Sequence, residues 1–271
     1  MNPITFHKPQ TLRDASDLFT QLDNAAFVSG GHTLLPSMKQ GFAAPDHLID
    51  LNQIPGNAQI SIDSGCLTIG AMARHVDVAS STIVKNAIPA LAGLAGSIGD
   101  RQVRQRGTIG GSVANNDPAA DYPSAVLGLG ATVITTQREI LADDFFVSLF
   151  ETALRPGEII TAVRFPVPKS AGYAKFKSPA ARYPQAGVFI ALFELSIRVA
   201  VTGAGASGVF RLTQLEQLLA KQFDSAAAQS LEIDTKELLS DLYATQDYRA
   251  NLVKIMAGRA IAHMGQASVF K

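Results

Sequence analysis

A glycine-rich stretch between residues 99 and 123, GDRQVRQRGTIGGSVANNDPAADYP, constrains the fold more than any other part of this chain. It holds too few large apolar residues to form a core of its own, and its glycines are too ordered for a linker. Gly110 and Gly111 have no Cβ, so the backbone there can approach a flat or anionic group closely. Successive amide N–H groups in such a bend favour phosphate. The alternative interpretation is an ordinary tight turn between a helix and a strand, because turn glycines are common.

A second glycine turn lies near the N-terminus, in residues 29–33, SGGHT. It follows a short apolar strand at residues 26–28 and precedes helix-compatible residues 34–40. A strand, a glycine turn and a helix in this order point the first N–H groups of the helix at an anion. Two such turns suit a ligand with two phosphates, each turn donating backbone N–H groups, and the hydroxyls of Thr33 and Thr108 can add donors.

Composition narrows the class of protein to which these turns belong. The length of 271 residues suggests two compact units or one large unit, and the 47% of hydrophobic residues are enough for a full core. A formal net charge of zero gives no electrostatic signal for nucleic acid or for an acidic membrane. The single cysteine, Cys66, excludes a disulfide framework and any four-thiolate iron–sulfur or zinc site within this chain. With no signal-peptide pattern and no bilayer-spanning apolar run, we expect a cytoplasmic protein without membrane insertion.

The hydrophobic periodicity along the chain predicts an alternation of helices and short strands. The segment 166–172, with prolines at both 166 and 168, is the best candidate for a domain boundary. The expected elements are helix 11–22, strand 47–51, a hairpin over 60–69, helices from 76 and from 89, helix 125–129, strands 131–136 and 159–165, a strand pair or one bent strand over 189–203, and helices 212–219 and 248–264.

Residues 203–208, GAGASG, match the dinucleotide-binding pattern G-x-G-x-x-G after a strand-like run. That fold needs the pattern near the start of a long alternation of strands and helices. Here only a short and mostly helical remainder follows. We therefore interpret these glycines as a turn, and not as evidence for an NAD-dependent dehydrogenase.

Two aspartates and a histidine near the turns have both functional and structural interpretations. Asp117 and Asp121 can form a carboxylate pair for acid–base chemistry. Alternatively, Asp121 binds a sugar hydroxyl and Asp117 caps a turn. His32 is better explained as a residue that shapes its loop than as a catalytic group, because no nucleophile pattern lies near it in the sequence. The other four histidines, His7, His47, His75 and His263, show no metal-ligand spacing.

The basic residues also allow two interpretations. Arg101, Arg104 and Arg106 form either a phosphate clamp or a solvated helix end, and we favour the latter for at least two of them. Lys175 and Lys177 lie on a predicted strand just after the domain boundary. One or both can face a ligand, although lysine side chains usually face solvent.

Several motifs of the chain resemble those of one family, the medium FAD-binding subunits of molybdenum hydroxylases, such as carbon monoxide dehydrogenase medium chains and the flavin domain of xanthine dehydrogenase. Residues 29–36, SGGHTLLP, resemble the first flavin-diphosphate loop of the family, and residues 102–112, QVRQRGTIGGS, resemble the second. The resemblance runs through essentially the whole chain, and the two loops together are highly specific. Further similar segments are 115–123, LRPGEII at 154–160, VTGAG at 201–205 and DYR at 247–249.

The resemblance implies an α+β fold, in which a two-subdomain FAD-binding fold of the vanillyl-alcohol-oxidase (PCMH) type precedes a C-terminal α+β domain. The implied boundaries are 1–168 for the FAD-binding domain, with subdomains at about 1–54 and 55–168, and 169–271 for the C-terminal domain. Asp121 would contact the ribose or adenine side of FAD, and three of the other residues, Ile160, Lys177 and Tyr183, would lie by the isoalloxazine ring. No catalytic residue or metal ligand is implied. The full set of implied cofactor-binding residues is Ser29, Gly30, Gly31, His32, Thr33, Leu34, Thr108, Ile109, Gly110, Gly111, Ser112, Asn115, Asp121, Ile160, Lys177 and Tyr183.

The resemblance also implies a function. FAD in this chain would receive electrons from [2Fe–2S] clusters in a small subunit, which take them from a molybdenum cofactor in a large subunit, and would pass them to an external acceptor. The expected assembly is a dimer of heterotrimers. Two alternatives stay open: a self-contained FAD-dependent oxidase or dehydrogenase of the same fold, and an assembly subunit without flavin.

Overall fold

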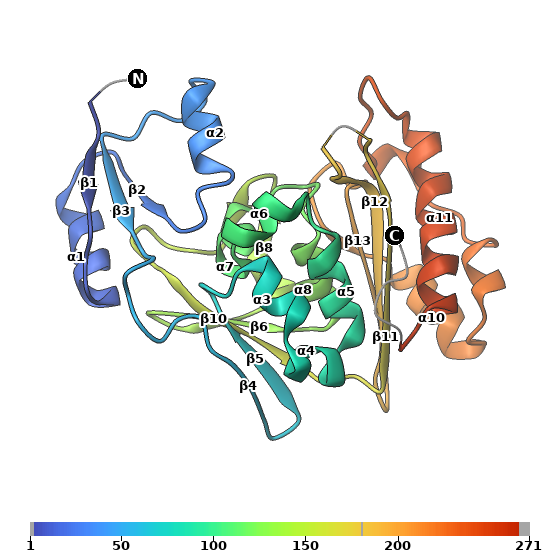
Figure 1. The fold of residues 1–271 in the computed structure, drawn as a ribbon. Helices are drawn as coiled ribbons and strands as arrows, with labels where there is room; N and C mark the ends of the chain where they lie inside the picture. The colour runs from blue at the N-terminus through green and yellow to red at the C-terminus, as the bar shows by residue number, and fades with distance from the viewer. Residues whose placement is uncertain (1–2, 180, 266–271) are drawn as a thin grey trace.

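The computed structural model describes residues 3–179 and 181–265, and three parts follow one another across the molecule (Figure 1). The N-terminal part, blue in Figure 1, is built on a three-stranded sheet, the middle part on a five-stranded sheet and the C-terminal part on a four-stranded sheet. The predicted α+β class is confirmed. Residues 266–271, the end of the predicted C-terminal domain, lie outside the described residues. Within the described ranges, every helix is too short or too polar to cross a bilayer.

The N-terminal part is a β-α-β-α-β unit whose strands are all parallel, in the order β1-β3-β2. Thr11 begins the first helix as predicted, because its hydroxyl accepts a hydrogen bond from the Asp14 N–H at 3.1 Å. The loop 29–33 leaves the carboxyl end of β2, the edge at which open α/β sheets bind ligands. The elements are β1 (Thr5–His7), α1 (Leu12–Gln21), β2 (Ala25–Val28), α2 (Leu34–Lys39) and β3 (His47–Asp50).

The middle part contains an antiparallel sheet in the order β4-β5-β10-β6-β7. The predicted hairpin is present, and its turn residues Ser64 and Gly65 have φ of 49° and 76°, as the favoured two-residue turn requires. The strands are β4 (Ile60–Asp63), β5 (Cys66–Gly70), β6 (Thr132–Thr135), β7 (Glu139–Leu141) and β10 (Ile160–Pro166), with a separate hairpin of β8 (Phe146–Ser148) and β9 (Glu151–Thr152).

The glycine-rich stretch forms two helices joined at Gly107, and not the simple turn considered above. Glycine lowers helix propensity, so the second helix depends on its surroundings. The Thr108 hydroxyl caps it by accepting a hydrogen bond from the Gly111 N–H at 3.1 Å. Gly110 packs so closely on Ala71 that a Cβ on Gly110 would lie 2.5 Å from the Ala71 Cβ. The helices of this part are α3 (His75–Ser80), α4 (Thr82–Ala87), α5 (Pro89–Ser97), α6 (Arg101–Arg106), α7 (Ile109–Asn115), α8 (Tyr122–Gly128) and α9 (Ala142–Phe145).

The C-terminal part has a strand pair in residues 189–203, the first of the two predicted alternatives. Side chains along it point alternately to opposite faces, so Val188 and Ile190 pack against α10 and α11 whereas Phe189 belongs to the core of the middle part. The sheet is thus covered by α11 on its outer face and by α5 and α8 on its inner face (Figure 1). The elements are β11 (Ser170–Lys177), β12 (Pro184–Leu192), β13 (Ile197–Thr202), β14 (Phe210–Arg211), α10 (Thr213–Lys221), α11 (Gln246–Ala262) and short 3-10 helices at Ser225–Ala228 and Thr235–Glu237.

Candidate cofactor site

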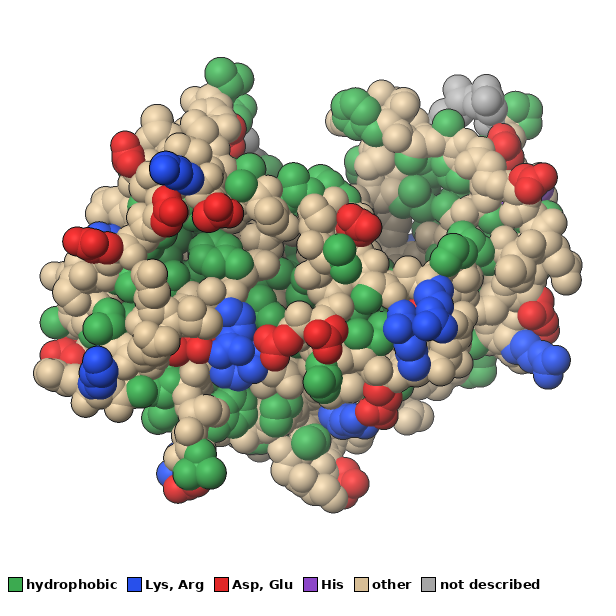
Figure 2. Space-filling model, turned by 180° about the vertical axis from the view of Figure 1, so that it is seen from behind, with side chains coloured by type: hydrophobic (Ala, Val, Ile, Leu, Met, Phe, Trp, Pro, Cys, Tyr) green, Lys and Arg blue, Asp and Glu red, His purple; other side chains and the backbone are tan. Residues whose placement is uncertain are grey.

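A cavity of about 570 Å³ lies where the three parts of the chain meet. Figure 2 shows, from behind, that the molecule is hollowed between its N-terminal part on the right and its C-terminal part on the left. A cavity of this size is typical of a small-molecule or cofactor site. Its wall is formed by the loop after β2, the link between β5 and α3, parts of α6 and α7, and residues 117–121, 154–160 and 181–183.

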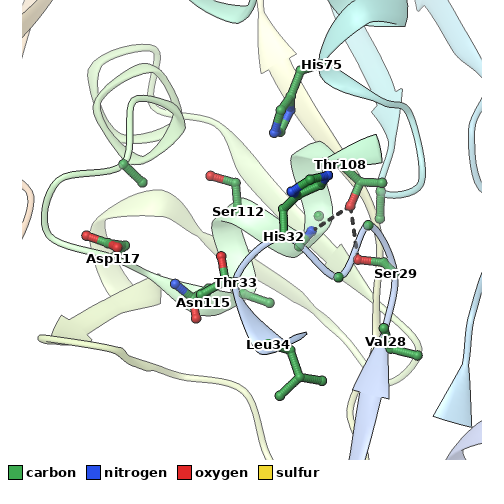
Figure 3. A pocket seen from close by; sticks show the side chains of 18 of the residues that line it. Val28, Ser29, His32, Thr33, Leu34, His75, Thr108, Ser112, Asn115 and Asp117 are labelled. Atoms are coloured by element: carbon green, nitrogen blue, oxygen red, sulfur yellow. Dashed lines mark hydrogen bonds between the residues drawn. The ribbon is translucent and has the colours of Figure 1, made fainter. Parts of the chain in front are cut away.

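The two glycine turns lie side by side in this wall (Figure 3). The hydroxyl oxygens of Ser29 and Thr108 are 3.2 Å apart. A Cβ on Gly30 would lie 2.4 Å from the carbonyl oxygen of Arg106, so no side chain fits there. The two turns therefore form one structural unit, although the elements from α2 to α6 separate them in the sequence.

The first turn presents free backbone donors. Among residues 3–179 and 181–265, the N–H groups of Gly30, Gly31, His32 and Thr33 have no hydrogen-bond partner. Gly31 has a φ of 72°, and alternation of backbone conformation about such a residue turns successive N–H groups toward one point. This loop is therefore a concave set of donors that suits an anion.

The second turn differs from the prediction, because the backbone N–H groups of Ile109, Gly110 and Gly111 are already used within the chain. The N–H of Ile109 donates to the Ala73 carbonyl at 3.0 Å and that of Gly110 to the Ala71 carbonyl at 2.8 Å. The Gly111 N–H donates to the Thr108 hydroxyl. What this turn offers the cavity is therefore side-chain chemistry, namely the hydroxyls of Thr108 and Ser112.

Most of the residues predicted to bind the cofactor do line the cavity, but Ile109 and Lys177 do not. Ile109 is fully buried in the core of the middle part. The strand register shifts between Phe176 and Lys177, and this irregularity leaves the Lys177 side chain exposed at the end of β11. The predicted residues in the wall are Ser29, Gly30, Gly31, His32, Thr33, Leu34, Thr108, Gly110, Gly111, Ser112, Asn115, Asp121, Ile160 and Tyr183.

The lysine that does turn inward is Lys175, and its partner is Asp121. The Lys175 Nζ lies 2.7 Å from Asp121 Oδ1, and both side chains are 4% exposed. The Tyr173 hydroxyl donates to the same oxygen at 2.6 Å. A buried carboxylate with a cation and a hydroxyl donor is electrostatically balanced. Asp121 therefore enters the wall as a neutralised acceptor rather than as one of two carboxylates that share a proton.

Asp117 has the structural role that was the alternative in the sequence. Its carboxylate accepts a hydrogen bond from the Ala119 N–H at 2.8 Å and caps a turn, while burial raises its pKa. Tyr183, in the turn between β11 and β12, lies 43% exposed at the wall, and burial also raises its pKa. Neither residue has the partner that acid–base catalysis would need.

The arginines and the histidine near the two turns do not form a phosphate clamp. Arg104 donates to the carbonyls of Ile98 and Gly99 and so caps the end of α5, and Arg101 and Arg106 are exposed. This favours the solvated helix end over the phosphate clamp. His32 is exposed in its loop. In the part of the chain that the structure describes, no three His, Cys, Asp or Glu side chains form a possible metal site.

Two wall residues were missed by the sequence analysis, His75 and Glu158. His75 is 5% exposed, and burial, together with the charges of His32 and Arg104, lowers its pKa to about 4. Glu158 accepts hydrogen bonds from the Thr135 hydroxyl at 2.6 Å and from the Arg155 N–H at 2.8 Å, and pairs with Arg138. No local sequence pattern marks either residue. Glu158 lies within the segment 154–160 that resembles the family, whereas His75 lies in none of the segments quoted for the resemblance.

The G-x-G-x-x-G segment is a turn, as interpreted. It joins β13 to the short antiparallel strand β14, whereas a dinucleotide site needs a helix after the glycines. Gly203 has a φ of 79°, and a Cβ on it would lie 2.3 Å from the Pro184 carbonyl oxygen. A Cβ on Gly205 would lie equally close to the Gly208 carbonyl oxygen, at 2.3 Å. The glycines serve local packing of the chain.

Comparison with known proteins supports a single family. Residues 2–168 match the family described as "FAD binding domain in molybdopterin dehydrogenase". The chain is 34% identical to the carbon monoxide dehydrogenase medium chain of Hydrogenophaga pseudoflava, over 94% of this chain and 95% of that protein. It is 31% identical to the nicotine 6-hydroxylase medium subunit of Paenarthrobacter nicotinovorans, over 97% of each.

Solved structures agree with these sequence relatives. The structure of carbon monoxide dehydrogenase from Hydrogenophaga pseudoflava, in a form that lacks the Mo-pyranopterin moiety of its cofactor, matches with a TM-score of 0.86 at 32% identity. The match covers 96% of both chains. Quinoline 2-oxidoreductase from Pseudomonas putida 86 shares the fold, with a TM-score of 0.87 at 24% identity over 98% of both chains. The chain belongs to the family of FAD-binding medium subunits of molybdenum hydroxylases, which are oxidoreductases.

Proposed function

We propose that this chain is the electron-transfer subunit of a molybdenum hydroxylase complex. FAD held in this chain receives electrons from [2Fe–2S] clusters of a small subunit, which take them from a molybdenum cofactor in a large subunit. An external acceptor then removes the electrons. The relatives support the proposal, since the carbon monoxide dehydrogenase and nicotine 6-hydroxylase proteins are each a medium chain or subunit of a larger enzyme.

The observation that carries the proposal is the row of free N–H groups from Gly30 to Thr33. Those groups lie beside the Thr108 hydroxyl, in a cavity of about 570 Å³. The diphosphate of FAD is an anion with many acceptor oxygens, and backbone N–H groups in a bend are suited to it. The residues present therefore fit the diphosphate of FAD.

The other predicted residues take roles consistent with their positions in the wall. The hydroxyls of Thr108 and Ser112 and the amide of Asn115 add polar contacts. The apolar side chain of Ile160 and the ring of Tyr183 border the flavin. Asp121 receives its two hydrogen-bonding contacts at Oδ1, so Oδ2 is the oxygen that accepts from a ribose hydroxyl.

The chemistry of electron exchange is supplied by FAD when it is bound. The residues of this chain bind the nucleotide, orient it and exclude water, and none of them acts as an acid or a base. We propose that residues 1–168, with subdomains at about 1–54 and 55–168, hold FAD and that residues 169–271 form the C-terminal domain. The match of the family to residues 2–168 supports this division.

The partner arrangement is the other part of the proposal. We expect a dimer of heterotrimers in the cytoplasm, where a lone free cysteine such as Cys66 stays reduced. Purification of an affinity-tagged chain from its native host tests which cofactors and which partner subunits accompany it. Absorption bands of flavin and of iron–sulfur clusters in the purified material, with three polypeptides in equal amounts, are the expected result.

Two other results would favour the alternatives. A colourless chain that takes up no FAD on reconstitution would indicate an assembly subunit. Turnover of an alcohol or aldehyde by the purified chain alone would indicate a self-contained oxidase. The mass of the purified complex separates one heterotrimer from two.

A further inference from the structure

A buried histidine in the cavity wall lacks a hydrogen-bond partner. Among the residues described, the Nδ1 atom of His75 is buried without a partner, and so is the hydroxyl of Tyr122 behind it. The two rings are 5.4 Å apart. Burying a polar atom without a partner destabilises the folded state. The chain therefore carries an unfavourable feature at its cavity, and such exceptions cluster at functional sites.

The position of this ring is fixed by the second glycine turn. The His75 N–H donates to the Gly107 carbonyl at 2.9 Å. The ring lies against the same residue, because a Cβ on Gly107 would lie 2.5 Å from His75 Nε2. Gly107 in turn contacts Gly30. In Figure 3 the ring of His75 lies above the ring of His32. His75 thus lies beside the place where the two turns meet.

The side chains that act electrostatically on the His75 ring are both basic. His32 from the loop after β2 and Arg104 from α6 act on the ring electrostatically. On its own helix, Arg74 and Asp77 neutralise one another through a contact of 2.8 Å. The ring is neutral at neutral pH, since burial and the two basic neighbours lower its pKa to about 4.

A neutral imidazole carries one proton, on either Nδ1 or Nε2. Nδ1 faces no acceptor, so a proton there would be buried without a hydrogen bond. A proton on Nε2 instead lies at the cavity wall beside Gly107. The arrangement favours Nε2–H as a donor held toward a ligand.

We propose that His75 is a cofactor-binding residue, whose Nε2–H donates a hydrogen bond to the diphosphate of the nucleotide held by residues 30–33. This inference rests on the proposed function. The buried Nδ1 keeps no partner, so the residue lowers the stability of the empty protein, while the bond from Nε2–H raises the affinity for the nucleotide.

The test compares three variants of the full chain, in the assembly in which it is purified and after removal of flavin. His75→Leu removes both nitrogens, and His75→Gln keeps an N–H donor at a similar distance from the backbone. His47→Gln is the matched control, because His47 lies on β3 outside the cavity wall. FAD affinity is measured by flavin fluorescence, and the affinities for ADP and riboflavin by calorimetry.

His75→Leu is expected to lower the affinities for FAD and ADP about tenfold or more, with riboflavin unaffected, since a hydrogen bond to a charged group is lost. His75→Gln restores most of the affinity, and His47→Gln matches the wild type. The thermal midpoint of flavin-free His75→Leu is expected to equal or exceed that of the wild type. A merely structural role would lower it.

Unchanged FAD affinity in His75→Leu overturns the inference, as does a loss confined to riboflavin or a loss that follows a lowered midpoint. Each of these results leaves the proposed function intact, provided that the wild-type protein binds FAD. Failure of the wild type to bind FAD overturns the proposed function itself, and this inference with it.

Discussion

Gly30 and Gly107 touch through their backbones: a Cβ on Gly30 would lie 2.7 Å from the Gly107 Cα. Neither residue could carry a side chain in this arrangement, because a Cβ on Gly107 would also meet the ring of His75. The contact joins the N-terminal part to the middle part at the cavity itself. The loop at residues 29–33 is therefore positioned by a steric fit between two glycines.

Gly30→Ala is expected to destabilise the protein by about 1–3 kcal/mol, the usual cost of overpacking, and to weaken FAD binding by separating the two turns. Chemical denaturation and a flavin titration measure the two effects. Gly96→Ala in α5 is the control, because its Cβ would meet only the Ala79 Cβ at 3.7 Å. It should stabilise the helix by about 0.5–1 kcal/mol. Equal behaviour of the two variants would contradict the steric argument.

Asp121→Asn leaves the buried ammonium of Lys175 without its counter-charge, and a loss of about 3–5 kcal/mol in unfolding free energy is expected. Lys175→Met should cost a similar amount, because it leaves the carboxylate unpaired. The double variant should lose less than the sum of the two single variants, since neither charge then remains. A double-mutant cycle by urea denaturation measures this coupling. If the losses of the two single variants simply add in the double variant, the interaction between Asp121 and Lys175 makes no net contribution to stability.

The stability of the empty protein should fall between pH 6.5 and about pH 4 because of His75. The folded-state pKa of about 4 lies below the ordinary value of 6.5, so the unfolded chain takes up the proton first as the pH falls. The difference corresponds to about 3 kcal/mol, present above pH 6.5 and lost as the pH approaches 4. His75→Gln should flatten this part of the pH–stability curve. An equally steep curve in the variant would assign the slope to other groups.

Glu158 should also make the stability of the protein fall with falling pH, but at lower pH than His75 does. Burial alone would raise its pKa, but hydrogen bonds from Arg138, Thr135 and the Arg155 N–H outweigh that effect and lower the pKa below 4.5. Its contribution is therefore present above pH 4.5 and lost as the pH falls through the folded-state value. Glu158→Gln should cost about 1–3 kcal/mol at pH 7.

The role of Glu158 is tested by the difference in urea midpoint between the wild type and Glu158→Gln. Urea midpoints at pH 7 and pH 3.5 should show a gap that narrows in acid. A constant gap would mean that the carboxylate charge is not what stabilises the turn at residues 154–158.

The local features of this protein could be predicted from its sequence, because each depends on neighbouring residues. The Thr11 cap, the Ser64–Gly65 turn and the glycine turn after β2 are all present. The helix α7 could not be predicted, since its glycines disfavour a helix and it depends on packing on Ala71 and on the Thr108 cap.

The buried polar residues of the site could not be predicted from the sequence either. Lys175 and Lys177 are equivalent in the sequence pattern, and only the register shift at the end of β11 decides which one turns inward. His75 is unremarkable in sequence, and its missing partner is visible only in three dimensions. Strand register and burial are set by contacts between distant segments, which no short motif encodes.

Phe189 and Ala200, on the inner face of the C-terminal sheet, are buried in the same core as Leu91 and Val126 of the middle part. Because the two parts share this core, the C-terminal part cannot be exchanged freely in evolution. A gene rearrangement could replace about the last hundred residues only if the new segment supplied matching apolar side chains for this core. Without them, the helices of the middle part would be exposed to solvent. The C-terminal third is thus tied to its neighbour by packing, whatever role it has in assembly.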